Sequence, residues 1–436
     1  MSSQFPDTSA QLVQATHGQA RPLRRRLFLA AVCLATIFVL PSEGYLGRAR
    51  SAFLINSAVG NRGFQLGAWE AQALGQKAQD LVTRPGSELS REQGHDLVVT
   101  YFDAIGRTGE LNGQIARIHA DPNQRDPIAA SASLQQELDA LRAAQARRRP
   151  AVEYIIEQQT AAVLAEEGLA AGKWVLPPVQ FQFTESPSTL IISPRDRIAV
   201  ESNKYVDPAL PVAGMEKIES QIEKALDRSA LIEGTGGFSA YPTMVVETND
   251  LEWVLNTVAH EWLHTYMFFR PLGWHYGDSG STRTMNETVA SIVGEEVGQR
   301  VLERFYPERV AQADWPRPLS MSPAKLAKPE FQFGKFMHDT RLTVDQMLAA
   351  SQIPQAEAFM EAQRQELIKH GYYLRRLNQA YFAFHGSYAV GASATDPIGG
   401  KLRALRRQAG SLANFVHTVA RMITLAELDA ELGIGS

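Results

Sequence analysis

The sequence predicts an α+β protein that is mostly helical, with a small sheet in the middle of the chain. Residues 51–172 and the chain after residue 330 read as helices, with apolar side chains at helical spacing. In contrast, apolar Val179, Phe181 and Phe183 alternate with polar residues, and this period of two is typical of a half-buried strand. A length of 436 residues exceeds one ordinary core, so two or three packed units are expected.

The N-terminus carries a basic stretch followed by an apolar run. Residues 1–26 are expected to be disordered, and residues 27–40 are apolar apart from Thr36. Such a run spans about 21 Å as a helix, less than the roughly 30 Å of a bilayer core, which favours a signal peptide but leaves a short membrane anchor open. The basic residues before the run place the rest of the chain outside the cytoplasm, exported or membrane-anchored. They are Arg21, Arg24, Arg25 and Arg26.

Overall composition argues against two classes of partner and site. The chain has 43 Lys and Arg against 47 Asp and Glu, and this balance gives no support for a nucleic-acid partner, which requires a basic excess. The only cysteine, Cys33, lies in the apolar run, so a disulfide framework and a cysteine-based zinc site are both excluded.

The first helical region, residues 51–172, contains one clear start signal and one expected break. The sequence Ser-Arg-Glu-Gln from Ser90 to Gln93 predicts a capping box that opens a helix. Residues 134–146 and 151–169 have helical patterns and are expected to form a pair broken at Pro150, since proline interrupts the helical hydrogen bonds.

The sheet is expected within residues 173–305. Strands are predicted at residues 179–184, 189–193 and 198–201, followed by a helix over residues 212–232. Another strand is predicted at residues 241–247, directly before the segment that carries the chemistry.

That segment contains the motif His-Glu-x-x-His at His260, Glu261 and His264. Positions i and i+4 of a helix lie about 40° apart on one face, so the two imidazoles can bind one ion, and zinc suits them. Glu261 then lies beside the metal, where a base for a bound water is needed. Asn249 and Asp250 supply an N-cap. The alternative is a chance match on a structural helix, but a buried helix with three polar groups needs a reason to hold them.

A third ligand is expected from a second helical pattern at residues 285–296. Its Asn286-Glu287 pair resembles the third-ligand helix of the gluzincins, most closely the thermolysin type, and the resemblance covers residues 244–298. By this resemblance Glu287 completes a zinc site, and residues 173–305 form a zincin-like catalytic core. Three carboxylates remain as rival ligands: Asp278, Glu295 and Glu296. A metzincin is excluded because Met267 and Arg270 stand where that class has glycine and histidine.

The resemblance carries two further implications and one departure. It implies that residues 241–247 form an edge strand that pairs with an extended substrate. It also implies an aspartate four residues after the glutamate, where this chain has Ser291. A hydroxyl adds no charge, so support for the histidines is expected to be weaker or to come from elsewhere.

An oxyanion donor is expected from the helical C-terminal region, residues 306–436, which would complete the cleft. Tyr381, His385 and Tyr388 lie at i, i+4 and i+7, so His385 or Tyr388 is predicted to face the zinc, although an aromatic core stripe would have the same spacing. The loop at residues 270–284, in which aromatic residues flank His275, is the second candidate source of this donor.

Together these features predict a zinc metallopeptidase that hydrolyses peptide bonds outside the cytoplasm. Peptides or proteins would be its substrates, and the N-terminal segment would link it to a membrane. The alternative is a membrane-tethered zinc-binding scaffold without catalysis, which Glu261 argues against because a purely structural site needs no such carboxylate. Endopeptidase and aminopeptidase activity both remain open.

Overall fold

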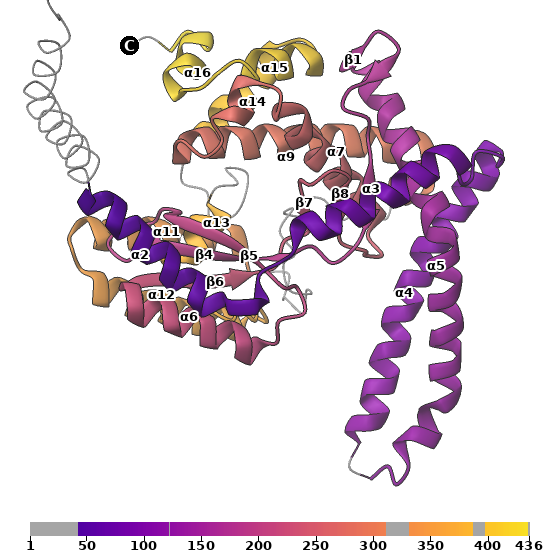
Figure 1. The fold of residues 1–436 in the computed structure, drawn as a ribbon, viewed down its shortest axis with the longest axis horizontal. Helices are drawn as coiled ribbons and strands as arrows, with labels where there is room; N and C mark the ends of the chain where they lie inside the picture. Colours follow the sequence, from indigo (N-terminus) through magenta and orange to yellow (C-terminus); the bar gives the residue numbers. More distant parts are fainter. Residues whose placement is uncertain (1–41, 122, 311–330, 387–396, 435–436) are drawn as a thin grey trace, which may run out of the picture. The chain divides into compact units, whose positions relative to one another are not determined.

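The computed structural model describes residues 42–121, 123–310, 331–386 and 397–434 (Figure 1). They form a mostly helical α+β structure with small sheets, as predicted. The predicted disordered N-terminus, the apolar run at residues 27–40 and Tyr388 lie outside the described residues. Among the described helices, none has both the length and the apolar character that a membrane crossing requires.

The chain divides into two compact units, Met1–Gly60 and Asn61–Ser436. The described part of the first unit is the helix α2 (Ser42–Val59). A short 3-10 turn, Gly60–Arg62, follows it. The helices of the second unit are α3 (Leu66–Thr83), α4 (Arg91–Ala120), α5 (Pro127–Glu166), α6 (Val212–Leu226), α7 (Leu251–Met267), α8 (Pro271–Trp274), α9 (Gly280–Phe305), α10 (Pro307–Val310), α11 (Phe333–Ala349), α12 (Ile353–Lys369), α13 (Gln379–His385), α14 (Ile398–Gln408), α15 (Leu412–Val419) and α16 (Leu425–Glu431). Its strands are β1 (Ala170–Ala171), β2 (Trp174–Val175), β3 (Phe181–Phe183), β4 (Ser188–Pro194), β5 (Ser202–Val206), β6 (Arg228–Glu233), β7 (Gly237–Phe238) and β8 (Thr243–Val245).

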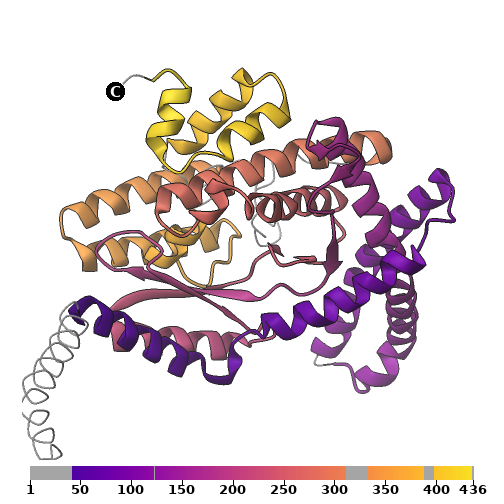
Figure 2. The ribbon, with the colours of Figure 1, turned by 45° about the horizontal axis from the view of Figure 1, so that its top comes forward.

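Helices α7 and α9 form the centre of the larger core. Asp250 caps α7 by accepting a hydrogen bond from the N–H of Trp253 (3.1 Å), as predicted. The helices approach closely because α9 has glycines at the contact: a Cβ at Gly294 would lie 2.7 Å from the carbonyl oxygen of Asn256, and one at Gly298 would overlap the same residue. The C-terminal helices α14, α15 and α16 (yellow) lie over α9 (Figure 2).

Helices α4 and α5 form a long hairpin (Figure 1). The predicted capping box is confirmed: Ser90 and Gln93 exchange side chain to backbone hydrogen bonds of 2.9 and 3.2 Å. The predicted break at Pro150 is wrong, because α5 runs through it as one helix. Proline removes one hydrogen bond at a cost of about 3 kcal/mol, and burial of Val152 and Ile156 immediately after it offsets that cost.

The strands form separate small sheets, not the single sheet that was predicted. One has the order β3-β8-β7 and another the order β5-β4-β6. The predicted strand at residues 198–201 is wrong by a few residues, since the strand that pairs with β4 is β5. The predicted helix 212–232 is too long: Asp227 has a left-handed φ of 53° and ends α6, and the apolar residues after it pair with β4 as strand β6.

The strand predicted to bind substrate lies in the middle of its sheet. β8 pairs with β3 on one side and with β7 on the other, so neither of its edges is open to a substrate. The implication that residues 241–247 form an edge strand is therefore wrong. β7 is the edge strand instead, and in the described part of the chain no strand pairs with its other side.

The opposite edge of this sheet is closed by carboxylates from α5. Glu157 accepts a hydrogen bond from the N–H of Phe181 (2.9 Å), and Glu153 accepts one from the N–H of Phe183 (2.7 Å). Lys77 on α3 pairs with both glutamates at 2.8 and 2.9 Å, and all three side chains are buried. Burial raises the pKa of Glu157 to about 7, and Lys77 opposes this effect. The buried cluster leaves β7 as the edge available for pairing.

Candidate metal centre

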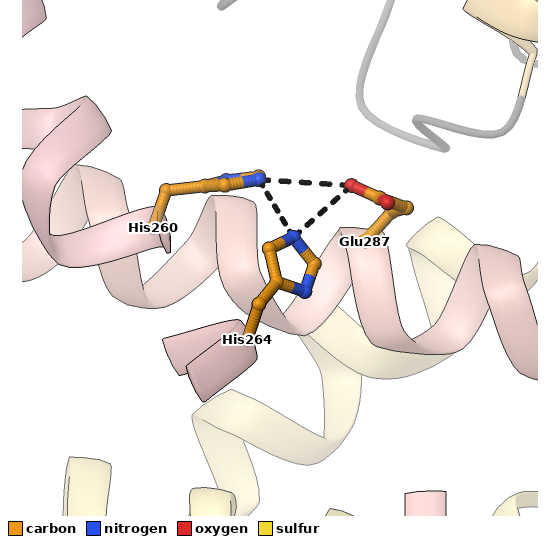
Figure 3. A group of neighbouring side chains, drawn as sticks. All are labelled: His260, His264 and Glu287. Atoms are coloured by element: carbon orange, nitrogen blue, oxygen red, sulfur yellow. Dashed lines mark hydrogen bonds and ion pairs between the residues drawn. The ribbon is translucent and has the colours of Figure 1, made fainter. Parts of the chain in front are cut away.

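Two helices bring together His260, His264 and Glu287, and this group could hold a metal ion (Figure 3). The Nε2 atoms of the histidines lie 3.1 Å apart, and Glu287 Oε2 lies 3.6 Å from the first and 3.4 Å from the second. A tetrahedral site with bonds of about 2.0–2.2 Å has ligand atoms about 3.3–3.6 Å apart, so these spacings fit zinc. The side chains of all three residues are largely buried, with at most 13% exposed.

The three rival carboxylates are not part of this group. Glu296 binds Arg406 of α14 through two hydrogen bonds of 2.7 and 2.8 Å. Asp278 accepts a hydrogen bond from His275 at 2.5 Å, and its side chain is exposed. Glu295 is half-buried, and burial raises its pKa, which the charges of Arg403 and His260 oppose. In the described part of the chain, Glu287 is the carboxylate that joins the two histidines.

Asn286 orients one of these histidines. Its Oδ1 accepts a hydrogen bond of 2.7 Å from Nδ1 of His264, which leaves Nε2 to face the metal. Ser291 does not orient a histidine, since its hydroxyl donates a hydrogen bond to the backbone carbonyl of Glu287 (2.9 Å). Support for the histidine thus comes from the residue directly before the third ligand. The Asn-Glu pair was visible in the sequence, but the role of the asparagine was missed.

Electrostatics favour a cation between the three groups. Burial alone would lower the pKa of His264, but the carboxylates of Glu287 and Glu261 and the bond to Asn286 raise it to about 9. Burial would raise the pKa of Glu287, but the two histidines hold it well below its usual range. The same negative charge that attracts a proton to the imidazoles attracts a metal ion.

Replacing Asn286 with alanine should weaken metal binding by about 10- to 100-fold, because His264 loses the bond that fixes its orientation. Competition with a chromogenic chelator would measure the affinity. Asn286→Asp keeps an acceptor and should bind the metal at least as tightly as the wild type. Ser291→Ala is the matched control and should leave the affinity unchanged. Equal affinities for Asn286→Ala and the wild type would show that His264 needs no such support.

The three metal-facing groups line a cavity of about 800 Å³. Glu261 lies in the same wall, where the hydroxyl of Ser239 donates a hydrogen bond to its carboxylate. Strand β7 runs against this carboxylate, since a Cβ at Gly237 would lie 2.5 Å from Glu261 Oε1. Glycine at this position therefore lets the edge strand pass directly beside the base proposed from the motif.

Two tyrosines face the metal-binding group. The hydroxyl of Tyr276 donates a hydrogen bond of 2.5 Å to Glu287 Oε1. Tyr205, on β5, lines the cavity; burial raises its pKa, and so do the nearby carboxylates of Glu287 and Glu261. Tyr276 lies in the loop that was the second place to look for a donor, whereas Tyr205 gave no signal in the sequence.

His385 lies at the end of α13 and is partly buried. Its ring packs in a tilted arrangement against Tyr381, with centroids 4.2 Å apart, and burial lowers its pKa to about 4. The cavity wall includes its neighbour Phe384 and not His385 itself. The C-terminal region thus contributes Phe384 to the cleft. His385, one of the two predicted oxyanion donors, does not line the cavity. Tyr388, the other, lies outside the described residues.

Comparison of the chain with protein-family models, curated proteins and solved structures finds no match. Two imidazoles and one carboxylate satisfy three positions of a tetrahedral ion. An ion held by these three groups would have a fourth position for a small ligand. Glu261 lines the same cavity as the three groups.

Proposed function

We propose that this chain is a zinc-dependent peptidase of the gluzincin type, with a zincin-like core. The observation that carries the proposal is the presence of His260, His264 and Glu287 in one cavity with the carboxylate of Glu261. Two histidines and one glutamate form a donor set that catalytic zinc sites use, and a purely structural site is usually closed by a fourth protein ligand. Zinc fits this set better than magnesium or calcium, which prefer oxygen ligands.

Each residue then has a defined part in the reaction. A zinc ion held by His260, His264 and Glu287 would supply a Lewis acid that lowers the pKa of a water to about 7 and polarises a carbonyl group. Glu261 accepts the proton of the attacking water and delivers it to the leaving amine, and Ser239 holds its carboxylate in position. Tyr205 presents a hydroxyl donor for the negative charge that develops on the carbonyl oxygen. Tyr276 holds Glu287 in its orientation toward the metal.

The substrate is proposed to be a peptide in an extended conformation. Among the described strands, β7 is the edge of its sheet and lies beside Glu261, and an extended peptide can pair with such an edge through backbone hydrogen bonds. The extracytoplasmic location is proposed from residues 21–40, whose basic stretch and apolar run are typical of an export signal or a membrane anchor.

Metal removal tests this function directly. The full chain with about one zinc bound should cleave members of a mixture of quenched fluorescent peptides. A chelator should abolish cleavage, and added zinc should restore it. Cleavage that survives complete removal of the metal would contradict the proposal. Bound zinc without cleavage of any peptide would favour the alternative, a membrane-tethered zinc-binding scaffold.

A further inference from the structure

Arg283 lines the cavity from the first turn of α9. Its guanidinium carbon lies 5.4 Å from the centre of the Tyr276 ring, and the hydroxyl of that tyrosine donates to Glu287. The cation is thus separated from a metal-facing carboxylate by a single aromatic ring. This contact holds the guanidinium against the Tyr276 ring in the wall of the cavity that the three groups also line.

Among the described residues, no carboxylate forms an ion pair with Arg283. Its Nε atom is buried and has no hydrogen-bond partner there. Other partly buried arginines of the same unit hold carboxylates through short hydrogen bonds, as Arg375 does with Glu219 and Arg406 with Glu296. Leaving a buried charged donor unsatisfied costs free energy, and Arg283 differs from these arginines in carrying that cost.

The other charged groups of the cavity do not supply the missing partner. Glu261 accepts a hydrogen bond from Ser239, and Glu287 faces the two histidines and Tyr276. Glu70, the remaining carboxylate in the wall, accepts a hydrogen bond of 3.4 Å from the N–H of Tyr241. Within the described ranges, the Nε donor of Arg283 is therefore left to a ligand that enters the cavity.

We propose that Arg283 binds a carboxylate of the substrate and thereby selects peptides that carry one next to the bond to be cleaved. The inference rests on the proposed peptidase function. A guanidinium presents two parallel donors that match a carboxylate, and charge-assisted bonds of this kind are about twice as strong as neutral ones. The carboxylate is either the C-terminus of the peptide or the side chain of an aspartate or glutamate, and the two sources are separated by experiment.

Three N-acetylated alanine tetrapeptides serve as probes: one with a free C-terminal carboxylate, one with a C-terminal amide, and one amide with a single aspartate. Isothermal titration calorimetry on the full chain carrying Glu261→Gln measures binding without turnover. The free acid or the aspartate peptide should bind about 10- to 100-fold more tightly than the neutral amide. This advantage should disappear in Arg283→Gln and persist in part in Arg283→Lys, which keeps the charge without the fork.

The matched control is Arg300→Gln, on the same helix, because Arg300 pairs with Glu167 at the surface. It should keep the full preference for a carboxylate. Each titration is repeated on the metal-free protein, since a carboxylate can also bind zinc. A preference that needs zinc and survives in Arg283→Gln would assign the carboxylate to the metal and overturn the proposal, as would equal binding of all three peptides. Cleavage of neutral amidated peptides would still support the peptidase function in that case.

Discussion

Glu261→Gln should retain zinc and lower peptidase turnover by a factor of about 10² or more. Glutamine has nearly the same shape as glutamate and can still contact Ser239, so the cavity wall should be preserved. It cannot accept a proton from the attacking water. Measurement of kcat on a peptide that the wild type cleaves, together with metal analysis of the same samples, would separate loss of the base from loss of the metal.

Glu252→Gln is the matched control for this change. Glu252 lies in the first turn of the same helix, so the substitution removes the same charge without touching the cavity wall. It should leave kcat and the metal content unchanged. If Glu261→Gln kept full activity with zinc bound, Glu261 would be a bystander and the water would need a different base.

The metal-binding part of the site could be predicted because its geometry is local. His260 and His264 are four residues apart on one helix, and Asp250 marks where that helix begins, so their common face follows from the chain alone. Glu287 needed more than local geometry. Its assignment came from a resemblance, and the close packing of the two helices at Gly294 accounts for how it reaches the histidines.

The rest of the cavity could not be predicted because it depends on contacts between distant segments. Tyr205 and Ser239 belong to strands whose pairing partners cannot be identified from periodicity, and β5 was placed several residues too early. The helix predicted over residues 212–232 was too long for a related reason. A short apolar run is compatible with either a buried strand or a helix. The run at the end of this segment forms a strand because it pairs with β4.

The proline in α5 illustrates the same limit. Its local cost predicts a break, but the helix continues because tertiary packing provides more free energy than one lost hydrogen bond. This matters for the site, since the glutamates that close the edge of the sheet at β3 lie on α5 just after Pro150. A break there would have moved them away from the strand.

Removal of the metal ligands should have the largest effect on zinc content. The wild-type chain should bind about one zinc, and His260→Ala or His264→Ala should abolish stoichiometric binding, because each leaves only two protein ligands. Glu287→Ala should weaken binding far more than Glu295→Ala or Glu296→Ala. Metal analysis after dialysis and chelator competition would give the stoichiometry and the affinities.

The three glutamates form a matched series on one helix, since each change removes one carboxylate from α9. Glu296 already holds Arg406, so Glu296→Ala should lower the free energy of unfolding slightly while zinc binding is retained. Zinc should raise the melting temperature of the wild type and of Glu296→Ala, because it binds the folded state, and should do so far less for Glu287→Ala. A larger loss of zinc in Glu295→Ala than in Glu287→Ala would displace the third ligand by two helical turns. Stoichiometric zinc in a chain lacking both His260 and His264 would rule out this centre altogether.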